Sequence, residues 1–499
     1  MVWQIILFGI LGLLIARGVF ETFIQRTSTL QRNFPLLAHF RYWLEEVGAP
    51  LRQYIVSSDT EEKPYNRNTR TWIYASSKGE NNVIGFGSEV DHNAPGTVHI
   101  LPNLFPVIKT APGPEPLPPV IGPDRRFPYQ PQSFFNISGM SFGSLSANAV
   151  HALSAGAKRA GLYMSTGEGA LSPHHAEGGA DIVFQVGPAK FGIRSADGKF
   201  DPEKLRELAA RPYVKMIEVK LAQGAKPGKG GVLPKEKITE EIAAIRGIAM
   251  GEDCHSPNGH AEFSDVAGLL DFVSYLQELT GKPTGIKMVG GRNSQSEELA
   301  RRIRDTGKTP DFIIIDGSEG GSGAAPLALA DYVGLPLRDG LTNMDNALRK
   351  YGVRKKTVLI GSGKIATGGD VAQALAFGAD MVNIARGFLL SIGCIQAMRC
   401  QTNHCPTGIT TQNAWLQRGL DPTLKSLRVA NYANTLKKDL FMILHACGLE
   451  HPNQLSREHL TMVVAPGDTR SVSELYPYPH EGSDAAATER RATPWGRAV

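Results

Sequence analysis

The chain has 499 residues, of which 42% are hydrophobic and 20% are charged, and these globular proportions exclude wholesale disorder and collagen-like repeats. Its 53 basic and 48 acidic residues leave a net charge of +5, so nothing in the composition favours nucleic-acid binding. Five cysteines exclude a disulfide-based scaffold, and the length suits one large domain with extensions or two to three ordinary domains.

An apolar segment opens the chain. Residues 2–16 carry no charge and would span roughly 22 Å as a helix, whereas an extension to Ile24 gives about 34 Å if Arg17 reaches the headgroups. We predict a membrane anchor over residues 1–24. A secretory signal peptide and a buried N-terminal helix are the alternatives, and the signal peptide lacks a preceding basic residue and an A-x-A site. Arg17, Arg26 and Arg32 follow the apolar run, which places the main domain in the cytoplasm.

Residues 25–131 are expected to form a small N-terminal subdomain. Apolar residues near helical spacing predict a helix over residues 34–56, in which Arg41, Trp43 and Arg52 would lie at a lipid interface or pack on the main domain. Ten prolines between residues 101 and 131 exclude a helix or a central strand there. We interpret this stretch as an extended strap that leads to the main body.

Short apolar runs alternate with helical stretches from residue 132 to 425. Runs of this continuous kind are typical of parallel strands buried on both faces, and their number favours a (β/α)8 TIM barrel over an open sheet. The expected strands are 133–138, 161–166, 182–193, 214–221, 284–289, 311–316, 357–363 and 379–385. The expected helices are 146–160, 235–246, 264–280, 294–306, 346–351 and 370–377. Residues 426–499 are predicted to be a helical extension with a loosely ordered polar tail from Ala465 onward.

Glycine-rich loops follow several of these strands. The stretch 357–370 places Gly361, Gly363, Gly368 and Gly369 between a strand and a helix, where backbone N–H groups and the helix N-terminus suit a phosphate. Arg386 and Gly387 follow the next strand, and residues 164–175 and 316–326 are two further loops of this kind. Four such loops on one face suggest a flat, phosphate-bearing cofactor such as FMN. A Rossmann loop fits poorly because Ala366 replaces its third glycine, and glycines needed only for turn geometry are the other alternative.

Three cysteines lie close together in the sequence. Cys394, Cys400 and Cys405 have the spacing C-x5-C-x4-C, and a proline follows the last one, as in many iron–sulfur loops. Three thiolates suit a cuboidal cluster that lacks one iron corner. The alternatives are a zinc site, for which His404 would supply the fourth ligand, and three buried thiols without metal. Cys254 and Cys447 are expected to be plain buried thiols.

Taken together, these residues resemble the flavin-binding synthase domain of the glutamate synthases. The matching stretches between residues 134 and 420 are ISGMSFGSLS, STGEG, VKLAQGAKPGKGG, GIKMV, DGSEGGSGAAP, GSGKIATGGDVAQALAFGAD and GCIQAMRCQTNHCPTGI. The resemblance implies FMN, a 3Fe–4S cluster and reduction of 2-iminoglutarate, formed from 2-oxoglutarate and ammonia, to L-glutamate.

The resemblance also implies roles for individual residues. The flavin ring would be lined by Met140, Ser141, Ser165, Gln185 and Lys287. The remainder of the cofactor, including its phosphate, would be held by Asp316, Gly317, Gly320, Gly321, Gly361, Gly363, Arg386 and Gly387. Glu168 would lie where the imine forms, with Lys220, Lys226 and Arg246 around the dicarboxylate, and Cys394, Cys400 and Cys405 would bind the iron.

Departures from the family pattern concern the substrate and the partners. No cysteine precedes Cys254, so we expect no glutaminase of its own, and nitrogen would come from ammonia or an amidotransferase partner. Val232 replaces a glutamine that is usual in the family, and residues 255–260 read HSPNGH. No nicotinamide-binding domain is apparent, so electrons would come from ferredoxin or another donor. A related oxidoreductase acting on another 2-oxo acid or amino acid, and a non-catalytic electron-transfer subunit at the membrane, are the alternatives.

Overall fold

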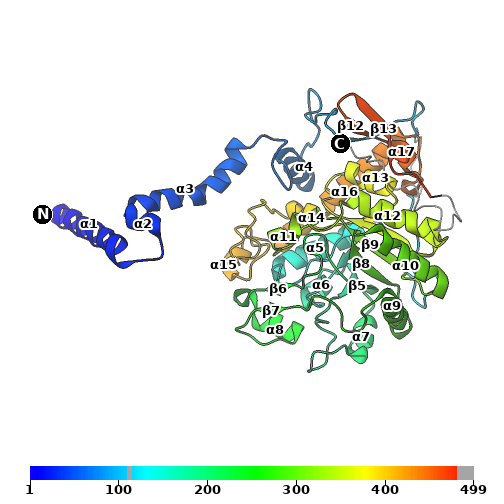
Figure 1. The fold of residues 1–499 in the computed structure, drawn as a ribbon, viewed down its shortest axis with the longest axis horizontal. Helices are drawn as coiled ribbons and strands as arrows, with labels where there is room; N and C mark the ends of the chain where they lie inside the picture. The colour runs from blue at the N-terminus through cyan, green and yellow to red at the C-terminus, as the bar shows by residue number, and fades with distance from the viewer. Residues whose placement is uncertain (109–114, 480–499) are drawn as a thin grey trace, which may run out of the picture. The chain divides into compact units, whose positions relative to one another are not determined.

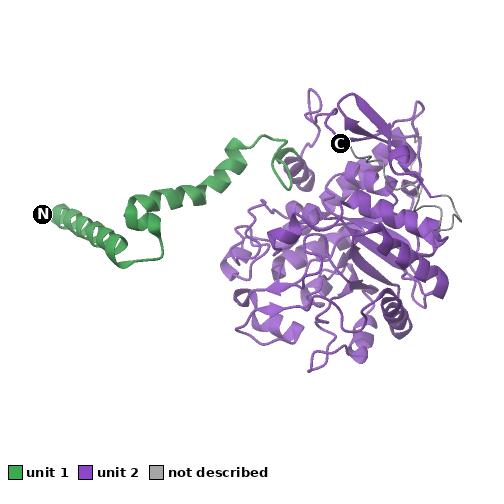
Figure 2. Ribbon diagram, in the orientation of Figure 1, with its two compact units in different colours: residues 1–68 green, residues 69–499 purple. Residues whose placement is uncertain are grey.

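The computed structural model describes residues 1–108 and 115–479. The chain divides into two compact units, Met1–Asn68 and Thr69–Val499, which are green and purple in Figure 2. Every residue predicted for the flavin, substrate and iron–sulfur sites belongs to the second unit. All of the candidate chemistry therefore lies in one unit.

A closed barrel of eight parallel strands forms the centre of the second unit and confirms the predicted (β/α)8 fold (Figure 1). The strands are neighbours in chain order, and β11 closes the barrel by pairing with β2. Seven strands fall within predicted runs, whereas the β4 strand ends well before residue 193. Their bounds are β2 (Phe135–Ile137), β3 (Tyr163–Ser165), β4 (Asp181–Val186), β5 (Val214–Lys220), β8 (Thr284–Val289), β9 (Phe312–Asp316), β10 (Val358–Ser362) and β11 (Met381–Ile384).

Helices alternate with these strands around the barrel. The larger ones are α5 (Ala147–Ala160), α7 (Pro202–Ala209), α9 (Val266–Thr280), α10 (Asn293–Thr306), α12 (Leu337–Lys350), α13 (Gly368–Ala376) and α16 (Pro422–Ala446). The shorter ones are α6 (Pro173–Glu177), α8 (Glu240–Arg246), α11 (Leu327–Ala330), α14 (Arg386–Ser391) and α15 (Ala414–Gln417). The helix predicted at 346–351 is only the end of α12, because buried Leu337, Leu341 and Leu348 extend its apolar face toward the N-terminus.

The predicted helix at 235–246 is divided in two. A 3-10 turn, η3 (Lys235–Lys237), precedes α8, because the side chain of Thr239 accepts a hydrogen bond from the Ile242 amide and so starts the helix there. A short antiparallel hairpin, β6 (Val232–Leu233) with β7 (Cys254–His255), brackets this segment. The segment therefore folds as a compact insert after β5.

The end of the proline-rich stretch closes the amino-terminal end of the barrel. Ile121 and Tyr129 form an antiparallel bridge, and both pack in a buried cluster with residues from the starts of the strands, such as Met216, Phe312 and Met381. Residues 109–114 of the predicted strap lie outside the described residues. Residues 115–131 contain no helix and no strand beyond the Ile121–Tyr129 bridge, and they serve as a plug for the barrel.

A second sheet, separate from the barrel, includes two strands that follow the last long helix, α16. It consists of β1 (Val98–Ile100), β12 (Leu460–Ala465) and β13 (Asp468–Ser471). The 3-10 turns η5 (Pro452–Gln454) and η6 (Arg457–His459) precede β12 and the small helix α17 (Val472–Leu475) follows β13, whereas the 3-10 turn η4 (Arg354–Lys356) lies between α12 and β10. The expectation of a loosely ordered tail from Ala465 is wrong up to residue 479. The β12–β13 hairpin pairs with β1, and this pairing orders a polar sequence that has little apolar content of its own. Residues 480–499 lie outside the described part.

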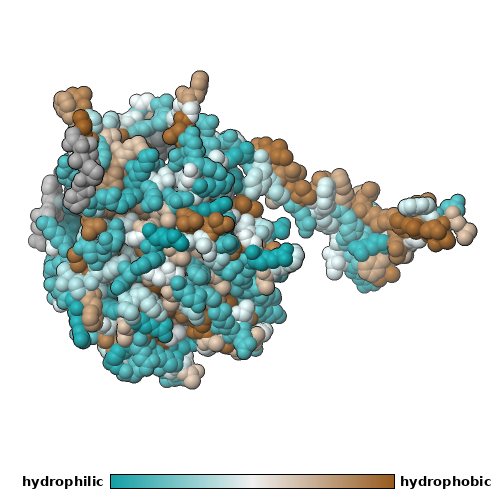
Figure 3. Space-filling model, turned by 180° about the vertical axis from the view of Figure 1, so that it is seen from behind, coloured by the Kyte–Doolittle hydropathy of each residue, from teal (hydrophilic) through white to brown (hydrophobic). Residues whose placement is uncertain are grey.

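The first unit is helical. It contains α1 (Val2–Val19), the π-helical turn η1 (Phe20–Ile24), α2 (Thr29–Asn33), α3 (Leu37–Leu51) and a second such turn, η2 (Arg52–Val56), and α4 (Arg67–Lys78) begins at its end. By length and composition, Val2–Ile24 is the one helix of the described residues that is able to cross a membrane, with a mean hydropathy of 2.0. Its apolar side chains are exposed in the structure, and apolar surface covers much of this unit (Figure 3).

Candidate active site

The carboxyl ends of the barrel strands bring the predicted cofactor residues together. Met140 and Ser141 follow β2, Ser165 ends β3, Gln185 lies in β4, Lys287 lies in β8, Asp316 ends β9, Gly363 follows β10 and Arg386 follows β11. Parallel strands in a barrel end on the same side, so these residues share one mouth. Lys287 and Asp316 are almost fully buried there, and buried charges require partners.

A buried carboxyl that the sequence analysis missed organises one side of the mouth. Glu218 of β5 accepts hydrogen bonds from Gln185 Nε2 at 2.7 Å and from Ser165 Oγ at 3.1 Å. Burial is the largest effect on this group and raises the pKa of Glu218, although Lys287 and the two hydrogen bonds oppose the rise. The sequence signal that could have identified Glu218 is an acidic residue at an inward-facing position of a strand with a mainly apolar core.

The ammonium group of Lys287 lies in the middle of the mouth. Its Nζ is 3.5 Å from Asp316 Oδ2 and donates to Ser138 Oγ at 3.4 Å. Asp316 Oδ2 also accepts from the Gly224 amide at 2.9 Å, so the loop after β5 is joined to the end of β9. These contacts hold a cation at a fixed, nearly dry position where a flavin ring would lie.

A second set of charges surrounds Glu168 in the loop after β3. Lys220 Nζ lies 3.1 Å from Glu168 Oε2 and also donates to Gln223 Oε1 at 2.5 Å. Burial alone would raise the pKa of the Glu168 carboxyl, but Lys220, Lys226 and Arg246 together hold that pKa below its ordinary value. The four residues predicted for the substrate site are therefore brought together, with one carboxylate among three cations.

The guanidinium of Arg246 is buried next to this set. Its NH2 group donates to the Phe142 carbonyl at 2.7 Å, and the guanidinium lies 5.1 Å from the centre of the Phe191 ring. The Nε–H group has no hydrogen-bond partner within residues 1–108 and 115–479. A buried, unpaired guanidinium donor is an observation that fits a bound carboxylate.

The glycine-rich loops after β9, β10 and β11 lie against one another. The Gly317 amide donates to the Ser362 carbonyl at 2.7 Å, and Arg386 donates to the Glu319 carbonyl. Gly363 has φ +144°, and a side chain there would stand 3.1 Å from the Gly317 nitrogen and 3.2 Å from its Cα. This conformation and this lack of space require glycine at residue 363, and the exposed backbone of Gly321 lies against the Arg386 side chain, where a phosphate could bind.

Four of the predicted glycines are used for packing or turns in the protein itself. Gly361 lies inside β10 against Leu341, and Gly387 lies in α14 beneath Tyr432. Gly368 and Gly369 begin α13, whose first turn is already capped, because Asp370 Oδ2 accepts from the amides of Ala366 and Thr367 at 2.9 Å each. The Asp370 carboxylate therefore already binds two of the amide groups that precede α13.

The three clustered cysteines lie on one loop, the cysteine loop (residues 394–412), directly after α14. All three are free thiols, and the charges of Cys400 and Cys405 both act on Cys394. Burial raises the pKa of Cys394 to about 11. Burial also opposes ionisation of Cys405, but hydrogen bonds from Thr407 and Thr410 hold the pKa of Cys405 below its ordinary value.

The donor chemistry of the cysteine loop fits iron better than zinc. Three thiols share the loop, and no set of three His, Cys, Asp or Glu side chains in the described part, these cysteines and His404 included, is arranged to hold one ion. A tetrahedral zinc site needs four ligands around a single ion, whereas the thiolates of an iron–sulfur cluster each bind a separate iron and lie further apart. The loop is therefore a candidate for a cluster.

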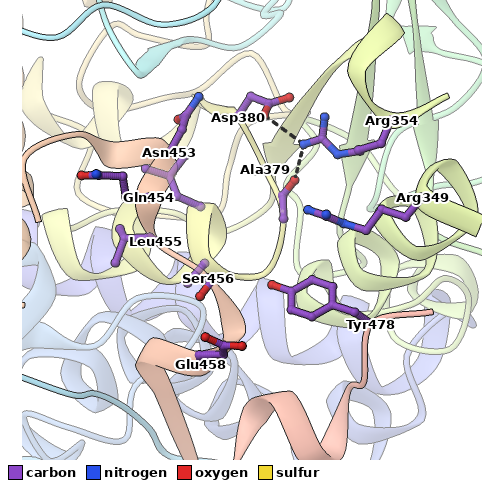
Figure 4. A pocket seen from close by; sticks show the side chains of 13 residues that line it. Arg349, Arg354, Ala379, Asp380, Asn453, Gln454, Leu455, Ser456, Glu458 and Tyr478 are labelled. Atoms are coloured by element: carbon purple, nitrogen blue, oxygen red, sulfur yellow. Dashed lines mark hydrogen bonds and ion pairs between the residues drawn. The ribbon is translucent and has the colours of Figure 1, made fainter. Parts of the chain in front are cut away.

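A hollow of about 320 Å³ lies at the opposite end of the barrel (Figure 4). It is bordered by Arg349, Arg354, Asp380 and Tyr478, and Asp380 directly precedes β11. Arg354 is paired with Asp345 and Asp380 at 2.8 and 2.9 Å, so its charge is compensated within the protein. None of the predicted site residues lines this hollow.

Comparison with known proteins agrees with this geometry. A family model described as the conserved region in glutamate synthase matches residues 125–450, which include the barrel and the cysteine loop. The chain belongs to the glutamate synthase family. This membership makes it an oxidoreductase of glutamate synthase type.

Relatives in this family differ in how much of their length the chain covers. A glutamate synthase large subunit-like protein of Bacillus subtilis is 38% identical over 90% of this chain and 93% of its own length. An archaeal glutamate synthase [NADPH] of Methanocaldococcus jannaschii is 36% identical over 63% of this chain, which spans 58% of that enzyme. A solved flavocytochrome b2 variant with bound sulfite has a TM-score of 0.46 and 14% identity over 97% of this chain and 98% of that one.

Proposed function

We propose that this glutamate synthase-family protein binds FMN in the barrel mouth and reduces 2-iminoglutarate, formed from 2-oxoglutarate and ammonia, to L-glutamate. The observation that carries the proposal is the set of three cations around Glu168 beside the buried ammonium of Lys287. A dicarboxylate needs cations at both ends, and an electron-rich ring needs a cation at its edge. The barrel mouth contains cations for a dicarboxylate and also a cation for the edge of the ring.

The flavin would be held by residues from seven of the eight strand ends. Met140, Ser141, Ser165, Gln185 and Lys287 would contact the ring, and the loops at Gly321, Gly363 and Arg386 would contact the phosphate. Bound there, FMN supplies a hydride to the substrate carbon. Lys287 would stabilise negative charge on the ring, while Glu218 keeps Gln185 and Ser165 in place.

The substrate would lie between the flavin ring and the charged set around Glu168. Arg246 and Lys226 would pair with the two carboxylates, and Lys220 would lie close to the reacting carbon through its contact with Glu168. Since the pKa of Glu168 is held low, its carboxylate is ionised, and its Oε atoms could accept hydrogen bonds from the ammonium ion that brings the nitrogen. Glu168 would therefore position the nitrogen donor where the imine forms.

The cysteine loop would hold a 3Fe–4S cluster through Cys394, Cys400 and Cys405. Such a cluster transfers single electrons, which suits ferredoxin or another one-electron donor. Nitrogen would come from free ammonia or from an amidotransferase partner. The relatives named glutamate synthase [NADPH] point to a nicotinamide as the ultimate donor in their own systems.

A specific observation favours a second candidate, a related oxidoreductase that acts on another 2-oxo acid or amino acid. Val232, which replaces the family's glutamine, pairs in the β6–β7 hairpin with His255, the first residue of the altered segment 255–260. Gly231, the neighbour of Val232, lies against the Glu168 carboxylate. The paired change therefore alters one wall of the substrate pocket.

We also propose that residues 1–24 anchor the protein to a membrane and that the barrel is cytoplasmic. A helix over Val2–Ile24 would span about 34 Å, against roughly 30 Å for a hydrocarbon core. None of its most apolar window is buried within the described protein, which argues against a core helix. Arg17 is paired with Glu21 at 2.6 Å, which lowers the cost of placing both near the headgroups.

Rapid-mixing experiments test the proposed reaction. The flavin would be reduced anaerobically and mixed with a series of 2-oxo acids, each with and without ammonia, while flavin absorbance is followed. We expect reoxidation to require both 2-oxoglutarate and ammonia. Faster reoxidation by another 2-oxo acid would establish the second candidate, and no reoxidation by any member of the series would refute both.

A further inference from the structure

Lys237, the last residue of η3, is a buried cation that none of the proposed steps uses. Its side chain is 2% exposed. Its Nζ donates to the Ser144 carbonyl at 2.9 Å and to the Cys400 carbonyl at 3.1 Å. One ammonium group therefore connects the cysteine loop to the loop that leads from the flavin-side residues Met140 and Ser141 into α5.

The carbonyls of this second loop, the junction loop (residues 142–145), are all bound. Arg246 holds the Phe142 carbonyl at 2.7 Å, and Lys237 holds that of Ser144 at 2.9 Å. The side-chain amide of Gln412 donates to both Gly143 and Leu145, at 3.1 and 2.9 Å. Three side chains, two from the insert after β5 and one from the cysteine loop, thus hold four consecutive carbonyls.

The insert after β5 contacts the cysteine loop in a second place. Asn403 Nδ2 donates to the Glu236 carbonyl at 2.8 Å, one residue before Lys237. Arg246, at the end of the same insert, reaches the substrate site. The insert therefore touches the substrate site at one end and the cysteine loop at the other, and both ends hold the junction loop.

Lys237 has no carboxylate partner in the part of the chain that the structure describes, and the charges that act on it come from the Cys400 and Cys405 thiolates and from Arg246. Its two recorded partners are neutral carbonyls, and no ion pair of Lys237 occurs within the part of the chain that the structure describes. A buried cation without a carboxylate acts strongly on nearby charge, because little water screens it. The nearest groups that would become more negative on reduction are those bound to Cys400 and Cys405.

We propose that Lys237 is a positioning residue that fixes the cysteine loop against the junction loop and whose unpaired charge favours the reduced form of the iron–sulfur cluster. The second part rests on the proposed function, since it requires the cluster. The first part concerns the protein alone. Together they make Lys237 the residue that sets how readily the cluster accepts an electron beside the flavin.

The test compares variants of Lys237 with a matched variant of Lys282. Lys282 is also a buried lysine that donates to two backbone carbonyls, those of Arg211 and Val214, but it lies just before β8, at the other end of the barrel. The variants are Lys237→Met, Lys237→Gln, Lys237→Arg and Lys282→Met. The Gln variant keeps N–H donors without charge, and the Arg variant keeps the charge.

In the iron-loaded enzyme, the midpoint potential of the cluster is measured by redox titration with electron paramagnetic resonance. We expect Lys237→Met and Lys237→Gln to lower the reduced-to-oxidised ratio at a fixed potential about tenfold, which is about 59 mV for one electron. Lys237→Arg and Lys282→Met should leave the midpoint potential within experimental error of the wild-type value. An unchanged potential in both uncharged variants would overturn the electrostatic part.

In iron-free protein, amide hydrogen exchange is measured over residues 141–146 and 400–411. Lys237→Met should speed exchange at least tenfold in both segments, whereas Lys282→Met should not. Unchanged or uniformly faster exchange would overturn the positioning part. If the wild type binds no iron at all, the proposed cluster fails, and the exchange experiment still decides whether Lys237 holds the two loops together.

Discussion

At the scale of single residues, the site depends on how buried charges are paired. Glu168 is ionised because three cations face it, and Glu218 stays inside the barrel because Gln185 and Ser165 donate to it. The two carboxyls lie at the same mouth, Glu168 in the loop after β3 and Glu218 in β5, yet their pKa values are shifted in opposite directions. The three cations keep Glu168 ionised, whereas burial is the largest effect on Glu218 and raises its pKa.

Replacing Lys220 with Met should lower the stability of the protein at neutral pH and have a smaller effect at acidic pH. The folded-state pKa of Glu168 lies below its unfolded value. Ionised Glu168 therefore contributes to the free energy of unfolding at pH values above the unfolded pKa, and this contribution is lost as the pH falls through the folded pKa. Lys220→Met should lower the free energy of unfolding by about 1–3 kcal/mol at pH 7, and the deficit should shrink below about pH 4. Urea unfolding at both pH values measures this. Lys199→Met, at a lysine whose side chain is 82% exposed, should change neither value.

Removing the guanidinium of Arg246 should weaken binding of a dicarboxylate. Arg246→Met is expected to raise the KM for 2-oxoglutarate roughly 10- to 100-fold, since a hydrogen bond to a charged group contributes about 1.5–3 kcal/mol. Steady-state kinetics give the value. Arg194→Met is the control, because Arg194 also lies 5.1 Å from the Phe191 ring but is not among the charges that act on Glu168. An unaltered KM would mean that another group binds the substrate carboxylates.

Loss of one thiol should remove the cluster and spare the flavin. Cys400→Ser is expected to abolish the iron–sulfur absorbance because the hydroxyl is a poor ligand for iron, while some flavin remains bound. Iron analysis and visible spectra measure both. The control variant Cys447→Ser replaces a buried thiol outside the cysteine loop and should retain the iron content of the wild type. Full iron content in Cys400→Ser would refute the ligand assignment.

At the scale of elements, the sequence predicted the strands better than the helices or the substrate site. Continuous apolar runs such as residues 311–316 identify barrel strands because both faces are buried. The start of α12, the β12–β13 hairpin and the role of Glu218 depend on distant partners, which local patterns do not record. The loop glycines were predictable as a group, but Gly361 and Gly368 pack against protein atoms that only the fold reveals.

The plug at the amino-terminal end of the barrel should contribute to stability without affecting chemistry. Arg125 Nε donates to Asp311 Oδ1 at 2.9 Å, and the same carboxylate accepts from Gln277 and from the Thr284 amide, both at 2.8 Å. Arg125→Met should lower the free energy of unfolding by about 1–3 kcal/mol, because it removes a charged partner from a buried carboxylate. Urea unfolding measures the loss, and flavin content should be unchanged. Arg126→Met, at an exposed neighbour, should be nearly neutral.

At the scale of the whole molecule, the candidate membrane span and the candidate site residues belong to different units. The candidate span belongs to Met1–Asn68, and the complete set of candidate ligands belongs to Thr69–Val499. The helix α4 is needed by the second unit, since Tyr74 donates to the Cys394 carbonyl at 2.7 Å and Asn431 donates to that of Ser77 at 3.1 Å. A functional truncation must therefore end before Arg67.

Deleting residues 1–56 should release the protein from membranes while leaving the cofactor sites intact. The deletion removes Val2–Ile24 and the exposed apolar residues of α3, but none of the buried core of the barrel. Fractionation of cells that express the full chain and the truncated chain measures the attachment, and visible spectra of both measure the cofactors. We expect the full chain in the membrane pellet and the truncated chain in the supernatant with the same absorbance per mole. A deletion of residues 1–24 alone distinguishes the span from α3. If this shorter variant stays in the pellet, attachment comes from α3. If the full chain is found in the supernatant, residues 1–24 are not an anchor.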